Sequence, residues 1–442
     1  MFKLFVQTLG CKVNSYESDA LTDCFRERGF ELTQDYAQAD VFLINTCTVT
    51  AEADRKSRQM IRRAKKRAPH AVVAAMGCQV EMNVEKCEAD VFVGTKDRIK
   101  IVDEVVSLLL QRLNSLRSVK ASPSIDRKSC DYQEYGSVVA QDSERAFIKI
   151  QDGCDRFCSY CIIPYARGRS RSRSFENIIS EARMLSASGY KEVVITGINI
   201  CAYGLDFPGE SVSLVDVVRG IADCKGIHRI RLGSMEPMYL SKSVIENFSG
   251  IEKLCKHFHI SLQSGSDRVL NAMNRHYDTG FFKELVLEIK RLMPEASITT
   301  DIIAGFPSET REEHEESLSF AASCSFSKIH VFPYSSRKGT LAEQLTPVVS
   351  PEIIKSRTED FLELARLSHQ VYAMSRIGCQ ENVLVELREK DGLLSGYSEG
   401  YLRVYLQSGD DRLLSNVIQV IPEALFLDGV IGKTMSYEVV NS

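Results

Sequence analysis

Three cysteines in one short stretch have the spacing of metal ligands. Cys154, Cys158 and Cys161 follow an apolar run, residues 146–150, that is typical of a β-strand. Thiolates hold iron–sulfur clusters, and a short loop can direct three of them to one point. Three protein ligands leave the fourth iron of a four-iron cluster open, and an open metal position usually indicates chemistry rather than a scaffold. The stretch therefore predicts a reactive iron–sulfur centre.

Two other interpretations of this stretch stay open on the residues alone. Spacings of four and three also describe one face of a helix, so the cysteines could be buried helical residues. Gly153 before the stretch and Pro164 after it favour a loop instead. A zinc site would normally need a fourth Cys or His nearby, and none follows within the next few residues.

The elements that position a second group of cysteines come earlier in the chain. Strand-like runs at residues 2–6, 41–44 and 72–75 alternate with helical patterns, which predicts a parallel sheet. The first helix is predicted to begin with a capping box formed by Asn14 and Glu17.

Cys11, Cys47 and Cys78 each follow one of these three strands. The carboxyl ends of parallel strands share one edge of a sheet, where ligands bind. We therefore expect the three thiols to converge. The alternative is that three small buried cysteines fall there by chance.

Length and composition limit the class of protein. The chain has 442 residues, enough for two or three domains. Its 14 cysteines are spread along the chain, with no signal peptide ahead of them and no apolar run near the ~20 residues that cross a membrane. These features predict a cytoplasmic protein with reduced thiols and no membrane partner. The formal charge of −4 neither requires nor excludes nucleic acid.

The expected fold class is α/β with three domains. After a linker at 114–143, six strand candidates alternate with helices from residue 144, which predicts an open barrel of six βα units with its site at the carboxyl ends of the strands. A long helix ends near 376, and the pattern then changes to period two, as in a small antiparallel β-barrel. The predicted boundaries are 1–113, 114–143, 144–376 and 377–442.

Basic residues gather in two places. A helix at about 53–68 and the segment directly after the cysteine loop are candidate RNA-phosphate contacts, and the second could alternatively hold a carboxylate. A solvated helix face and a flexible basic tail are the simpler explanations. The candidates are Arg62, Arg63, Lys65 and Lys66 in the helix, and Arg167, Arg169, Arg171 and Arg173 after the loop.

The cysteine stretch resembles the signature of radical S-adenosylmethionine (SAM) enzymes, and the whole chain resembles the methylthiotransferases. The resemblance implies that Cys154, Cys158 and Cys161 hold a 4Fe-4S cluster whose open iron binds SAM, and that Cys11, Cys47 and Cys78 hold a second 4Fe-4S cluster. It also suggests SAM-contacting residues: Tyr160, Gly197, Glu236, Gln263 and Phe306. The segment 396–404 resembles the OB-like TRAM module and makes Arg403 an RNA candidate, although Gly400 stands where Asn is expected. A barrel that only stabilises the chain or docks a protein is the alternative.

The segments 8–18 and 45–50 resemble the branch of the family that acts on N6-threonylcarbamoyladenosine beside the tRNA anticodon. The resemblance implies methylthiolation at C2 of that adenine, a carbon whose hydrogen neither acid nor base removes at neutral pH. It further implies a low-potential electron donor and a sulfur source as partners. Rival functions are the same reaction on isopentenyladenosine or on a ribosomal-protein side chain. A rival of another class is a non-catalytic electron carrier or RNA-binding scaffold.

Overall fold

The N-terminal part of the chain is a parallel sheet covered by helices on both faces. The computed structural model describes residues 1–113, 131–141, 143–209 and 212–435. The sheet has the strand order β2-β1-β3-β4-β5. Its strands are β1 (Lys3–Thr8), β2 (Glu31–Leu32), β3 (Val41–Thr46), β4 (Val72–Gly77) and β5 (Val91–Val93). The predicted parallel sheet is confirmed, and the two short edge strands β2 and β5 are additional.

Alternate residues of β3 face opposite sides of this sheet. Leu43 joins the core under helices α1 (Lys12–Glu27) and α4 (Lys100–Leu113). Phe42 and Ile44 join a second core under α2 (Ala51–Arg67). A parallel sheet buried on both faces needs apolar residues at every position of a central strand, and β3 supplies them. The short α3 (Cys78–Met82) follows β4 directly.

The central part is a curved parallel sheet with helices on its outer side. Two three-stranded sheets, β10-β9-β6 and β11-β12-β13, are joined by parallel bridges such as Met235 with Ile260. The strands are β6 (Arg145–Lys149), β9 (Glu192–Thr196), β10 (Arg229–Leu232), β11 (His257–His259), β12 (Ser297–Ala304) and β13 (Lys328–Pro333). This open arrangement of six strands, a half-barrel, confirms the predicted open barrel of six βα units.

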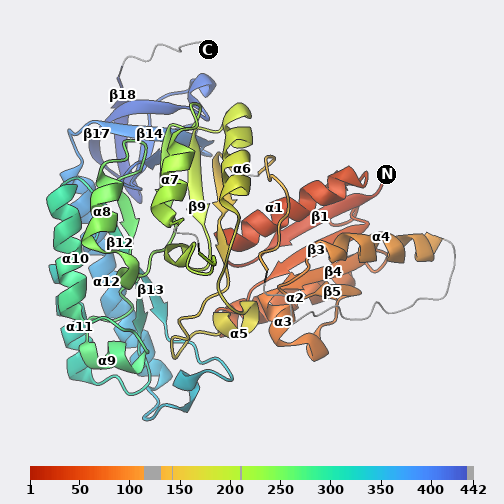
Figure 1. Cartoon of the computed structure of the whole chain (residues 1–442), viewed down its shortest axis with the longest axis horizontal. Helices are drawn as coiled ribbons and strands as arrows, with labels where there is room; N and C mark the ends of the chain where they lie inside the picture. Colours follow the sequence, from red (N-terminus) through yellow and green to blue (C-terminus); the bar gives the residue numbers. More distant parts are fainter. Residues whose placement is uncertain (114–130, 142, 210–211, 436–442) are drawn as a thin grey trace.

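Helices alternate with these strands along the chain. They are α6 (Phe175–Ala187), α7 (Leu214–Ala222), α8 (Lys242–Ser249), α9 (Asp267–Ala272), α10 (Thr279–Leu292) and α11 (Arg311–Ser323). Figure 1 shows α8, α10 and α11 along the side of the molecule opposite the N-terminal sheet. The long α12 (Pro351–Ser375) packs against β13 and leads to the C-terminal part.

The C-terminal part is a closed five-stranded barrel with the order β14-β15-β16-β18-β17. Its strands are β14 (Glu381–Arg388), β15 (Leu394–Ser398), β16 (Arg403–Leu406), β17 (Val417–Phe426) and β18 (Gly429–Thr434). The predicted small barrel is present, with one correction: β16 and β18 pair in parallel, so the barrel is mixed rather than purely antiparallel. An antiparallel hairpin cannot join these two strands because β17 lies between them in the chain.

The segment predicted as a linker joins the N-terminal and central parts. Residues 114–130 and 142 lie outside the described residues. In the described portion, Val138 is buried and the Tyr132 hydroxyl donates a hydrogen bond to the carbonyl of Lys149 in β6. Residues 131–141 therefore pack into the junction between the two parts.

No helix in the described residues has both the length and the apolar character that a membrane span requires.

Candidate active site between two groups of cysteines

Cys154, Cys158 and Cys161 lie in a loop, as the flanking Gly and Pro predicted. The loop connects the short strand β7 (Gln151–Asp152) to the short helix α5 (Ile163–Arg167). Its shape requires glycine at position 153, where φ is +71° and an added Cβ would lie 1.9 Å from the carbonyl oxygen of Arg169. The alternative that these cysteines share one face of a helix is therefore wrong.

Backbone hydrogen bonds hold the three thiols of the loop. The Cys161 N–H donates to the Cys158 carbonyl at 2.9 Å, and the Arg156 N–H points at the Cys154 sulfur at 3.5 Å. Burial, together with the neighbouring thiols, raises the pKa of Cys154 to about 11 and that of Cys161 to about 12. Iron binding at such a site must displace protons.

The sheet edge of the N-terminal part brings Cys11, Cys47 and Cys78 together. Cys11 precedes α1, Cys47 follows β3 and Cys78 begins α3. The chain turns at Gly10, where φ is +114° and an added Cβ would lie 3.2 Å from the Cys47 sulfur. Burial, with Cys78 and Cys11 nearby, raises the pKa of Cys47 to about 11. The expected convergence follows from parallel strands ending at one edge.

Both groups fit an iron–sulfur cluster as a donor set. All six cysteines are free thiols. Within the described ranges, no three His, Cys, Asp or Glu side chains are placed to hold a single metal ion. The ligands of a four-iron cluster bind different iron atoms, so they stand further apart than ligands of a single zinc ion.

Tyr160 and Gln263 line one small cavity, and Phe306 contacts its lining residue Tyr334, with ring centres 5.6 Å apart. Tyr160 and Phe306 belong to the same apolar cluster, and Phe306 is fully buried. Gln263 has a φ of +70°, and its N–H donates to the Asp301 carbonyl at 2.8 Å. The cavity of about 210 Å³ is lined by Tyr160, Gln263, Asp301, Ile303, Phe332, Pro333, Tyr334 and Ser335 of the central part, and by Val49 and Thr50 beside Cys47.

The other two candidates for SAM contact lie apart from this cavity. Glu236 is buried and forms an ion pair with Arg275, with Arg156 at 3.8 Å, and it lies near enough to Cys154 to help raise that thiol's pKa. Gly197 lines a second, larger cavity.

This larger cavity is built by all three parts of the chain. Its volume is about 560 Å³, and it borders Cys11. Asp301 and Phe332 line both cavities, so the larger one lies between Cys11 and the small cavity beside Tyr160. Its lining is Gly10, Cys11, Lys12 and Val13 from the N-terminal part, Thr196, Gly197, Leu232, Gly233, Ser234, His257, His259, Thr299, Asp301, His330 and Phe332 from the central part, and Tyr401 from the barrel.

Sequence reasoning did not select Lys12, His259 or Tyr401 as lining residues. The His259 ring lies 2.9 Å from the Thr299 hydroxyl and 3.1 Å from the Asp301 carboxylate. The Tyr401 ring stacks on His257 with ring centres 5.0 Å apart. The sequence offered one indication of this lining, a histidine at each end of the short strand β11. Alternate residues of a strand share a face, so both histidines could be expected to point to the same side of the sheet.

Three of the four arginines after the cysteine loop are buried, which corrects the expectation that they contact RNA phosphates or the SAM carboxylate. Arg167 and Arg173 are each 1% exposed and Arg171 is 5% exposed. Arg173 pairs with Glu181, and Arg171 lies 3.4 Å from Asp152. Of the four, only Arg169 is exposed, and it pairs with Asp155.

Arg167 belongs to a buried ionic network between the N-terminal and central parts. Glu17 of α1 pairs with Arg98 at 3.0 Å, Lys149 at 2.7 Å and Arg167 at 2.9 Å. Burial alone would raise the pKa of Glu17, yet these three cations lower it to about 2. Glu17 and Asn14 therefore do not cap α1; both are interior residues of the interface.

Asn14 connects this network to the cysteines. Its side-chain amide donates to the carbonyls of Leu9 and Thr46, which lie beside Cys11 and Cys47, at 2.7 and 3.2 Å. Its side-chain oxygen accepts from Arg167 at 2.7 Å. The arginine at the end of α5 thus fixes the position of one cysteine group relative to the other.

The C-terminal barrel docks on the central part through a second buried network. Glu192 pairs with Arg229 and Arg231. Arg231 also donates to the carbonyls of Ser398 and Glu399 at 3.0 and 2.8 Å. Its guanidinium lies 4.8 Å from the centre of the Tyr401 ring. The network holds Tyr401 at the mouth of the larger cavity.

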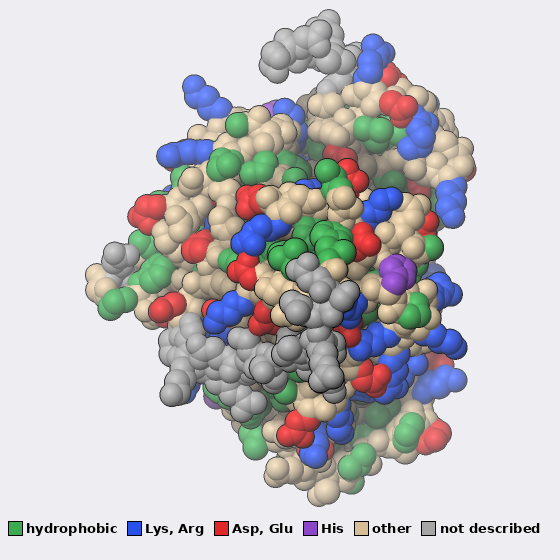
Figure 2. All heavy atoms as spheres, turned by 90° about the vertical axis from the view of Figure 1, so that its right-hand side faces the viewer, with side chains coloured by type: hydrophobic (Ala, Val, Ile, Leu, Met, Phe, Trp, Pro, Cys, Tyr) green, Lys and Arg blue, Asp and Glu red, His purple; other side chains and the backbone are tan. Residues whose placement is uncertain are grey.

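The remaining RNA candidates lie on the surface. Figure 2, which faces the N-terminal part, shows Lys and Arg side chains crowded at the lower right of that face. Arg62 pairs with Glu88, Lys65 with Asp90, and the Arg63 guanidinium lies over Tyr36. Exposed pairs of this kind contribute little to stability and can exchange for phosphate contacts. Lys66 is on the same helix, and Arg403 of the barrel pairs with Glu389 and Asp428.

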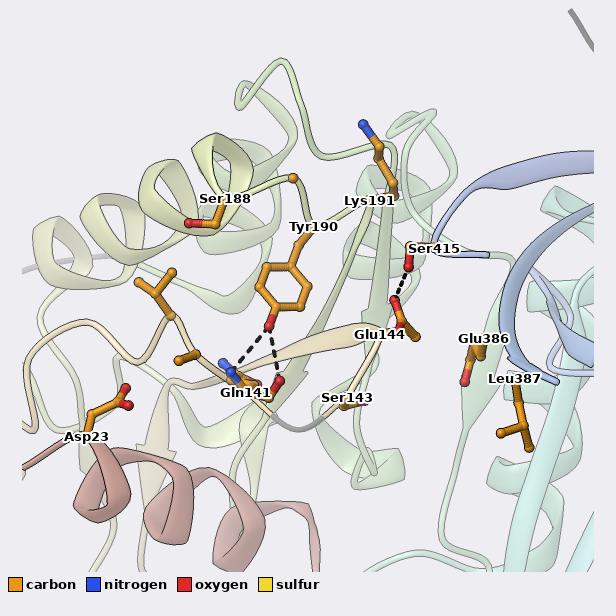
Figure 3. Close-up of a pocket in the computed structure, with 13 residues that line it drawn as sticks. Asp23, Gln141, Ser143, Glu144, Ser188, Tyr190, Lys191, Glu386, Leu387 and Ser415 are labelled. Carbon is orange, nitrogen blue, oxygen red and sulfur yellow. Dashed lines mark hydrogen bonds between the residues drawn. The ribbon is translucent and has the colours of Figure 1, made fainter. Parts of the chain in front are cut away.

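A wider cavity lies elsewhere. It has a volume of about 980 Å³, and Figure 3 shows it between α1, the strand β9 region and the barrel, with Glu144 bonded to Ser415. It shares no lining residue with the two cavities described above and contains no cysteine. We regard it as a solvent-open crevice where the three parts meet.

Comparison with known proteins defines first the class and then the family. Residues 148–321 match the model of the radical SAM superfamily, and residues 3–94 match a model described as "Uncharacterized protein family UPF0004". A cobalamin-containing radical SAM methyltransferase, TsrM from Kitasatospora setae, has a similar fold, with a TM-score of 0.51 at 16% identity over 75% of each chain. The half-barrel with its cysteine loop is thus a radical SAM fold.

Two relatives match almost the whole chain. The threonylcarbamoyladenosine tRNA methylthiotransferase MtaB of Bacillus subtilis is 35% identical over 431 residues, which is 93% of this chain and 92% of that protein. The tRNA-2-methylthio-N(6)-dimethylallyladenosine synthase of Clostridium botulinum is 32% identical over 406 residues, 90% and 87% of the respective chains. The chain therefore belongs to the radical SAM methylthiotransferase family. Membership implies a 4Fe-4S cluster and SAM as cofactors.

Proposed function

We propose that this protein is a tRNA methylthiotransferase that modifies C2 of N6-threonylcarbamoyladenosine beside the anticodon. The observation that supports the proposal most is the shared cavity of about 560 Å³, which borders Cys11 and adjoins the cavity beside Tyr160. A base that enters this cavity would lie beside Cys11 and next to the cavity that Tyr160 of the cysteine loop lines. The two tRNA-modifying relatives are 35% and 32% identical to this chain. This difference is too small to decide which of the two modified adenosines is the substrate.

The polar lining of the cavity favours the threonylcarbamoyl substrate over the dimethylallyl one. Lys12, His257, His259 and Asp301 all face it. His257, His259 and Asp301 have protein partners, so a dimethylallyl group would leave the Lys12 ammonium as the polar group without an acceptor among the described residues, and an unpaired, partly buried polar group costs free energy.

The protein's own residues would position the reactants and exclude water. Cys154, Cys158 and Cys161 would hold the cluster that binds SAM, and Cys11, Cys47 and Cys78 would hold a second 4Fe-4S cluster. When bound, these groups supply one-electron chemistry at an unactivated carbon and a source of sulfur. Tyr160 and Gln263 would contact SAM through the small cavity, with Phe306 packed beside its lining, and Gly197 and Glu236 would contact other parts of SAM.

Access to the cavity requires a base that has left its stack. A loop of tRNA offers such a base more readily than a duplex does. We propose that the barrel, the exposed side of α2 and Arg169 contact the tRNA. The proposed domains are 1–113, 144–376 and 377–442, joined by 114–143, and the proposed partners are tRNA, a low-potential electron donor and a sulfur source.

Mass spectrometry of tRNA nucleosides from a strain lacking the protein tests this function. We expect the methylthio form of threonylcarbamoyladenosine to disappear and to return when the wild-type chain is supplied. Persistence of that nucleoside, or loss of the methylthio form of isopentenyladenosine instead, would refute the proposal.

A further inference from the structure

Lys12 is a cation of the larger cavity that has no acid partner among the described residues. Lys12 lines it, one residue after Cys11, and its ammonium nitrogen lies 6.0 Å from the centre of the Tyr401 ring. In the part of the chain that the structure describes, no hydrogen bond or ion pair joins this ammonium to an acceptor. The side chain is half-buried.

The acids around the cavity already have partners. The Asp301 carboxylate lies 3.1 Å from the His259 ring. Glu192 is shared by Arg229 and Arg231, and Glu386 pairs with Arg145 at 3.0 Å. Among the described residues, none of these acids forms an ion pair with Lys12. A partly desolvated ammonium gains free energy when an anionic acceptor binds to it.

Another cation serves the N-terminal cysteine group. Arg167 donates to the side-chain oxygen of Asn14, whose amide holds the carbonyls of Leu9 and Thr46. The ammonium of Lys12 is instead near Tyr401, on the side of the barrel. The anion that suits Lys12 is therefore one that enters the cavity with the substrate.

We propose that Lys12 is a specificity residue whose ammonium binds an amino-acid carboxylate carried by the substrate adenine, with the Tyr401 ring forming the wall beside that substituent. The inference rests on the proposed function, because the threonylcarbamoyl group carries such a carboxylate and a dimethylallyl group carries none. Two domains then recognise the substituent together, since the N-terminal part supplies the charge and the C-terminal barrel supplies the wall.

The test compares two anticodon stem-loops that differ only in this carboxylate. One carries N6-threonylcarbamoyladenosine, and the other carries its methyl ester, which removes the charge. Dissociation constants are measured by fluorescence anisotropy on reconstituted protein, and methylthiolation is measured on the same samples. The variants are Lys12→Met, Lys12→Arg and, as a matched control, Lys355→Met on the exposed side of α12.

We expect the wild type and Lys355→Met to bind the acid about 10- to 100-fold more tightly than the ester, the range for a charge-assisted hydrogen bond. Lys12→Met should bind both stem-loops alike, with the affinity that the wild type has for the ester, and Lys12→Arg should keep part of the preference. Iron content equal to that of the wild type would show that the Met variant retains its clusters. The wild-type comparison of acid and ester stands even if that variant does not fold.

Three results would overturn the inference. The first is equal binding of acid and ester by the wild type, and the second is a preference for the acid that survives in Lys12→Met. The third is an equal loss of affinity of Lys12→Met for the acid, the ester and the unmodified stem-loop, which would indicate a backbone phosphate contact. Failure of the proposed function gives a different result. In that case the wild type forms methylthio product on a dimethylallyl stem-loop and none on the threonylcarbamoyl one, and both proposals fall together.

Discussion

Replacement of Glu17 by Gln should loosen the junction between the N-terminal and central parts. Glu17 is fully buried and holds three cations, Arg98, Lys149 and Arg167, each within 3.0 Å. Glutamine keeps the shape but removes the charge, so Lys149 and Arg167 keep Asp152 as an acid partner and Arg98 loses its ion pair. Breaking a buried ion pair costs about 3–5 kcal/mol.

The lowered pKa of Glu17 expresses the same interaction as a dependence of stability on pH. It falls from 4.5 to about 2 in the folded protein, which corresponds to about 3 kcal/mol at neutral pH. The unfolded chain takes up this proton near pH 4.5 and the folded protein only near pH 2. Acidification through that window therefore removes the stabilisation, and the Gln variant should lose less stability over it than the wild type does.

Hydrogen–deuterium exchange read by mass spectrometry is the suitable assay, because a chain of several domains does not unfold as one unit. Peptides covering α1 and β6 should exchange faster in Glu17→Gln, while those from the C-terminal barrel should not change. The matched control is Glu52→Gln, which removes an exposed carboxylate paired with Arg55 on α2, and we expect it to change nothing measurable. If Glu17→Gln exchanges no faster than this control, the ionic network does not hold the junction.

Two further predictions concern the clusters and the barrel. Cys158→Ala should abolish SAM cleavage and leave the iron at the N-terminal cysteines in place, because it removes one of the three proposed ligands in the loop. Iron analysis and a SAM-cleavage assay check this prediction, with Cys11→Ala as the reciprocal control. Retained cleavage would mean that other residues are the ligands. Arg231→Met should weaken docking of the C-terminal barrel by about 2–4 kcal/mol, since it removes an ion pair with Glu192 and two hydrogen bonds to carbonyls of the barrel. Limited proteolysis between α12 and β14 should become faster. An unchanged rate would show that other contacts hold the barrel on the central part.

The sequence by itself determined the local features of both cysteine groups. The thiols at 154, 158 and 161 are close in the chain, and Gly153 with Pro164 favoured a loop over a helix. The convergence of Cys11, Cys47 and Cys78 was also predictable, because parallel strands end at one edge of a sheet. The six strands of the half-barrel followed from alternating patterns of short apolar runs and helices.

Only the tertiary structure decided which charges are buried. The arginines at 167, 171 and 173 have the composition of a surface segment, yet their partners lie far away in the sequence: Arg167 and Glu17 are 150 residues apart. Asn14 and Glu17 have the spacing of a capping box, but the pattern of a helix start does not reveal what packs against that helix. Lys12 and Tyr401 meet at one cavity because separate domains dock through ionic networks, and no local pattern encodes such a contact.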